Sequence, residues 1–121
     1  MIKKYVPKKP MTSHWFMRTN AKNDKNTMVL FNRFVKLLDS DVQYFQCIPN
    51  NGVGHTVKWI MDHKVTSWSE LLLEVMRLAQ NVGNGWLLTG DVTSHCSAWC
   101  NRPRVAGVQS IEWTIVKTST D

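Results

Sequence analysis

The sequence predicts an α+β domain in which two helices pack on an antiparallel sheet of two hairpins, preceded by a basic, extended N-terminal arm. Three observations predict this class: an amphipathic pattern over 66–83, alternating segments joined by turn residues, and positive charge gathered near the start. The chain has 121 residues, the size of a single domain, and its six tryptophans favour a packed core. We assign residues 1–26 to the arm and 27–121 to the domain.

The arm is predicted from its prolines and its charge. Pro7 and Pro10 disfavour helix, and an apolar cluster around Trp15 precedes Arg18. The lysines of the arm are Lys3, Lys4, Lys8 and Lys9. The arm has three interpretations: a solvated tail with its aromatic residues packed on the core, a basic arm that grips phosphates while aromatic rings stack on bases, or a protein-docking arm.

Residues 27–39 are predicted to form the first helix. Asn26 or Thr27 can cap its start. A strand is the alternative, because Val29 and Val35 favour strands, but the apolar positions follow the helical period better than alternation. The positions at helical spacing are Leu30, Phe31, Phe34, Leu37 and Leu38.

A hairpin is predicted next, from two alternating segments at 42–48 and 55–61. Residues 49–52, Pro-Asn-Asn-Gly, are typical of a tight turn between them.

The second helix, 66–83, has the clearest signal in the chain. Ser67 can cap its first turn, and Glu70 lies three residues on, which is the spacing of a capping box. Gly83 follows the last apolar position, where we expect a left-handed C-cap.

A second hairpin is predicted from strands at 86–93 and 108–117. Gly90 interrupts the first of these strands and predicts a bulge or a close backbone approach. Residues 94–107 are expected to be a long connection, and long ordered loops often carry function.

The charge is uneven along the chain. The first 36 residues carry nine basic side chains and one acidic, whereas the remainder carries six basic and eight acidic, for a net charge of +6. This asymmetry favours a polyanionic partner, either nucleic acid or an acidic protein surface. No apolar run approaches the roughly 18 residues of a membrane helix, and the start lacks the pattern of a secretory signal. With only three cysteines, the chain is expected to be cytoplasmic, without membrane contact.

The 94–107 connection contains the strongest binding signal. Trp99, Arg102 and Arg104 lie close together there. Guanidinium groups beside an indole suit phosphate or carboxylate recognition, while the alternative is a solvated loop with the tryptophan packed beneath it.

Signals for catalysis or metal binding are weak. His95, Cys96 and Cys100 are close in sequence, but their spacing is looser than a Cys-x-x-Cys knuckle and no second pair exists. No nucleophile motif surrounds them, the carboxylates are scattered, and no phosphate-binding glycine loop is present. We therefore expect no catalytic residues, no metal and no cofactor.

The sequence leads to two main hypotheses. The first is a small non-enzymatic protein that binds nucleic acid or a nucleoprotein. The residues expected to make contact are Lys3, Lys4, Lys8, Lys9, Trp15, Arg18, Trp99, Arg102 and Arg104. The second is a modulator or inhibitor, of the kind phages make against host enzymes, that blocks a larger nucleic-acid-processing protein. A metal-dependent enzyme is the third hypothesis.

Overall fold

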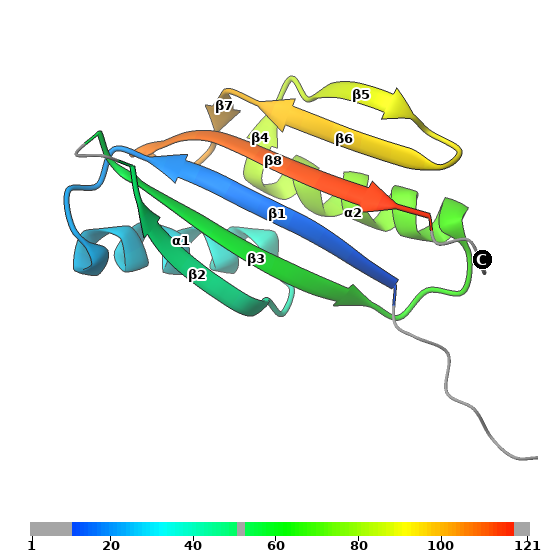
Figure 1. Ribbon diagram of the computed structural model, residues 1–121, viewed down its shortest axis with the longest axis horizontal. Coiled ribbons are helices and arrows are strands. Elements are labelled where there is room, and N and C mark those ends of the chain that lie inside the picture. The colour runs from blue at the N-terminus through cyan, green and yellow to red at the C-terminus, as the bar shows by residue number, and fades with distance from the viewer. Residues whose placement is uncertain (1–10, 51–52, 118–121) are drawn as a thin grey trace, which may run out of the picture.

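Six antiparallel strands form one sheet, two helices lie on one of its faces, and a two-stranded sheet adjoins it (Figure 1). The computed structural model describes residues 11–50 and 53–117. Its elements are β1 (Met11–Thr19), α1 (Asp24–Leu38), β2 (Gln43–Pro49), β3 (His55–His63), α2 (Trp68–Val82), β4 (Gly83–Asn84), β5 (Leu87–Asp91), β6 (His95–Cys100), β7 (Arg102–Pro103) and β8 (Val108–Val116). The main sheet has the order β2-β3-β1-β8-β6-β5. The α+β class with two helices is confirmed, whereas the sheet of two hairpins is corrected to this larger arrangement.

Strand β1 lies in the middle of the sheet, where the sequence analysis had placed part of the arm. It pairs with β3 on one side and with β8 on the other. Ser13, Trp15, Met17 and Thr19 are buried, while His14 and Arg18 are exposed. This alternation is that of a strand with one face on the core. Residues 11–19 therefore belong to the folded domain, and residues 1–10 of the expected arm lie outside the described residues.

Helix α1 confirms the helical interpretation of its segment over the strand alternative. Its cap is Asn23, whose side chain accepts a hydrogen bond of 2.8 Å from the Asn26 amide, so neither Asn26 nor Thr27 is the capping residue. The helix ends at Asp39, which has a left-handed backbone with φ of 58°.

Helix α2 begins at the predicted cap, with the Glu70 amide donating to the Ser67 hydroxyl over 3.2 Å. The Glu70 carboxylate accepts from the amide and hydroxyl of Thr66. The expected left-handed cap at Gly83 is wrong, because its φ of −170° is extended. Glycine is needed there for space, since a Cβ would lie 2.8 Å from the sulfur of Cys100.

Residues 94–107 contain two strands, β6 and β7, so the prediction of a long loop there is wrong. Strand β6 lies between β5 and β8, and β7 pairs with β4. The expected close approach at Gly90 is confirmed: its φ is 92°, and a Cβ there would clash with the carbonyl oxygen of His95.

The core between sheet and helices is rich in tryptophan. The rings of Trp15 and Trp59 stack with centroids 5.9 Å apart, and Phe34 of α1 packs edge-on against Trp59. Trp113 lies beside Trp15 on the neighbouring strand. Trp59 and Trp113 are buried, and Trp68 and Trp86 pack partly buried against the same core.

Candidate binding face of the sheet

The face of the main sheet opposite the helices is not covered by any helix or strand of the described part of the chain (Figure 1). Side chains on a strand alternate between faces, so residues next to the buried positions point to this side. We call this surface the open face. Its central residues are His14, Phe16, Arg18, Tyr44, Gln46, Lys58, Ile60, Trp99, Glu112 and Thr114, and Asp62 and Ser97 lie on the same side.

Aromatic and charged side chains alternate across the middle of the open face. Trp99 is paired with Glu112, Glu112 with Phe16, Phe16 with Lys58, and Lys58 with Gln46, each on the neighbouring strand. Neighbouring strands lie about 4.8 Å apart, which puts Trp99 and Phe16 roughly 10 Å from one another. Trp99 is 42% exposed despite its size. The row thus offers two separated ring surfaces with a charged group beside each.

A hollow of about 380 Å³ opens on the β2 side of the open face. Phe16, Ile60 and Tyr44 contribute apolar surface to it, and polar side chains complete its rim. The polar lining residues are His14, Gln46, Lys58 and Thr114.

Tyr44 lines this hollow at a point where β2 is irregular. The pairing of β2 with β3 shifts between Gln43 and Gln46, and Tyr44 has a positive φ of 52°. Phe45, the next residue, instead packs against Phe31 of α1 with ring centroids 5.5 Å apart. The two consecutive aromatic rings therefore lie on different sides of the sheet, as alternation along a strand requires.

The expected contact residues are divided by the structure. Trp99 and Arg18 are exposed on the open face. Trp15 is only 2% exposed and stacks on Trp59, so its expected role as a stacking residue for a ligand is corrected to a core role. Lys3, Lys4, Lys8 and Lys9 lie outside the described residues.

Arg102 and Arg104 are not part of the main sheet. Arg102 is in β7, which pairs with β4, and Arg104 follows Pro103. The Arg104 guanidinium donates to the side-chain oxygen of Asn84 over 3.2 Å. Both arginines are exposed, but the predicted loop that joined them to Trp99 is divided between two sheets.

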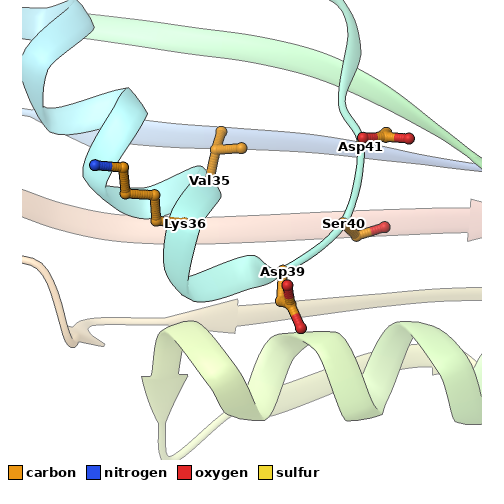
Figure 2. A pocket seen from close by; sticks show the side chains of 5 residues that line it. All are labelled: Val35, Lys36, Asp39, Ser40 and Asp41. Atoms are coloured by element: carbon orange, nitrogen blue, oxygen red, sulfur yellow. The ribbon is translucent and has the colours of Figure 1, made fainter.

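A second pocket lies at the C-terminal end of α1. Figure 2 shows its side chains: the Lys36 amine and the carboxylates of Asp39 and Asp41 point in three different directions. Because the charged groups do not converge, this pocket offers no common point for a ligand ion.

His95 lies on the opposite face of β6 from Cys96 and Cys100, because side chains alternate along a strand. Cys96 and Cys100 are buried on the helix side, whereas His95 is exposed. The two cysteines are four residues apart on one strand, or about 13 Å, so they cannot share a metal or form a disulfide. Burial raises the pKa of the Cys96 thiol, which makes it unreactive. Within residues 11–50 and 53–117, no group of three acidic, histidine or cysteine side chains is placed to hold a metal ion.

A buried chain of hydrogen bonds has the connectivity of a catalytic triad. The Trp15 indole donates to the Ser13 hydroxyl over 2.7 Å, and this hydroxyl lies 2.6 Å from Nε2 of His63. Nδ1 of His63 lies 2.6 Å from the Glu74 carboxylate. A carboxylate only accepts, so Nδ1 of His63 is the donor to Glu74.

Burial argues against catalysis by this group. Ser13 has no exposed surface, so a substrate cannot reach its oxygen in this structure. These hydrogen bonds instead satisfy the polar groups that β1, β3 and α2 bring into the core. Sequence reasoning missed it, because the partners Ser13, His63 and Glu74 are distant in sequence and follow no motif.

The comparisons with known proteins give no functional lead. The chain matches no model of a protein family, no curated protein and no solved structure. Neither helix of the described residues is long and apolar enough to cross a membrane.

Proposed function

We propose that this chain is a non-enzymatic protein that binds single-stranded nucleic acid on the open face. The observation that carries the proposal is the row in which Trp99 and Phe16 alternate with Glu112 and Lys58. Unpaired bases stack on aromatic side chains, and sheets with aromatic residues on an uncovered face are a recurrent platform for such strands.

The charges on the open face suit this partner. Arg18 and Lys58 are cations that can contact phosphates, while the carboxylate of Glu112 between the two rings can accept from base amino groups. The four lysines that precede β1 in the sequence would add phosphate contacts. They are Lys3, Lys4, Lys8 and Lys9. The proposed partner is therefore still nucleic acid, but the main binding surface is the sheet and not the N-terminal arm.

Fluorescence anisotropy with labelled single-stranded oligonucleotides tests the proposal. Phe16→Ala and Trp99→Ala should each weaken binding by about 5- to 160-fold, the loss of one stacked base. Leu73→Ala, at an exposed position of α2, is the control and should leave binding unchanged. Failure of the wild-type protein to bind any oligonucleotide at low salt would refute the proposal.

One observation favours the alternative of a protein-binding modulator. Strand β5 forms an outer edge of the main sheet, and Leu87, Leu88 and the following Val92 are exposed. Unpaired edges accept an extended segment of a partner through main-chain hydrogen bonds. A protein captured after nuclease treatment by the wild type, and lost with Leu88→Lys, would support this alternative.

A further inference from the structure

We infer that the hollow beside Tyr44 is a pocket for one nucleobase, which contacts the rings of Tyr44 and Phe16. The inference rests on the proposed function and specifies where on the open face a base is held and read. The volume of the hollow, about 380 Å³, falls at the lower end of the roughly 300–1,000 Å³ typical of small-ligand sites.

The apolar lining of the hollow suits a flat ring. Phe16 is on β1 and Ile60 on β3, and both lie on the open face beside Tyr44 of β2. An aromatic ring next to an aliphatic side chain presents the kind of surface on which bases stack irrespective of their identity.

The polar lining suits the edges of a base and its phosphate. The Gln46 amide has both donor and acceptor groups, the combination that distinguishes one base edge from another. Lys58, paired with Gln46 on the neighbouring strand, supplies the cation for a phosphate. His14, two residues before Phe16 on β1, and Thr114, its partner on β8, add further polar groups.

The conformation of Tyr44 is the independent observation. A tyrosine with φ of 52° is in a region that bulky residues rarely occupy, and such conformations cluster at functional sites. Its side chain is 78% exposed, so little packing against the protein compensates for this backbone conformation. A base held against the ring would supply the contact that the free protein lacks.

The test compares neighbouring aromatic residues at the same irregularity of β2. Anisotropy is measured with four homopolymeric oligonucleotides of about 12 nucleotides, for wild type, Tyr44→Ala and Phe45→Ala. Tyr44→Ala should weaken binding of the preferred oligonucleotide by about 5- to 160-fold. Phe45→Ala is the matched control, because Phe45 packs on α1, and it should change affinity by less than about twofold.

A third variant tests base reading. Gln46→Leu keeps the approximate size of the side chain but removes its hydrogen-bonding groups, so it should reduce the difference in affinity between the four oligonucleotides. Circular dichroism on every variant checks that the fold is retained.

The outcomes separate the two proposals. If the wild type binds oligonucleotides and Tyr44→Ala binds equally well, the base pocket is wrong and the proposed function stands. Equal losses in Tyr44→Ala and Phe45→Ala would also overturn the pocket, since the irregularity rather than the Tyr44 ring would then be responsible. If the wild type binds none, both proposals fall.

Discussion

Replacing Ser13 by alanine should destabilise the protein far more than an ordinary serine substitution in a strand. The hydroxyl of Ser13 is the partner of two buried groups, the indole N–H of Trp15 and Nε2 of His63. Alanine leaves both of them buried without a partner.

The magnitude follows from these two groups. An unsatisfied buried donor or acceptor costs about 1–3 kcal/mol, so the two together predict a loss of about 2–6 kcal/mol in the free energy of unfolding. Domains of this kind are stable by only about 5–15 kcal/mol, so the loss is a large fraction of the total. With a urea dependence of about 2 kcal/mol per molar, the middle of the usual range, the unfolding midpoint should fall by roughly 1–3 M.

Urea unfolding followed by tryptophan fluorescence measures this loss. The matched control is Ser97→Ala in β6, where the hydroxyl bonds to Thr114 over 2.9 Å on the opposite, partly exposed side of the same sheet. That change should cost about 1 kcal/mol or less, because water can replace the lost partner. If Ser13→Ala and Ser97→Ala cost the same, the buried hydrogen-bond chain does not stabilise the core and the reasoning is refuted.

Three further predictions concern the core, the open face and a helix cap. Trp15→Phe should destabilise more than Trp113→Phe in urea unfolding, because within the described residues the Trp113 indole N–H has no partner to lose; the reverse order would contradict the model of the core. Lys58→Gln should reduce the slope of log affinity against log salt by about 0.7, the effect of one phosphate contact on a single strand, and an unchanged slope would remove Lys58 from the interface. Hydrogen bonds from the backbone and hydroxyl of Thr66 lower the pKa of Glu70, so its stabilisation is present above the unfolded-state pKa and is lost as pH falls through the folded-state pKa. The stability difference between wild type and Glu70→Gln, measured by thermal unfolding, should therefore shrink in acid; a difference that grows there would contradict the cap geometry.

The helices could be predicted because their signals are local. The Ser67 cap and the apolar stripe of α2 lie in one continuous segment, the cap and the 15 residues of the helix, and the structure places both as expected. The β2–β3 hairpin likewise follows from alternation on either side of a turn.

Strands β1 and β6 could not be recognised in this way, because their buried positions do not all carry large apolar side chains. In β1, Ser13 and Thr19 are buried through hydrogen bonds to residues far along the chain, which obscures the alternation. In β6, the buried residues are small and the large apolar residue, Trp99, is exposed.

The open face could not be predicted for a different reason. Its residues come from separate strands, and only the register of those strands brings them together. Trp99 and Arg18 were identified as candidates from composition alone, but Phe16, Lys58 and Tyr44 needed the sheet to place them.

The central claim is that nucleic acid lies on the open face, and ultraviolet cross-linking to a single-stranded oligonucleotide tests it most directly. Peptides carrying the cross-link are then mapped by mass spectrometry. The account predicts cross-links at Phe16, Tyr44 or Trp99, whose rings face this surface. Cross-links found instead only on the exposed sides of α1 and α2 would contradict it.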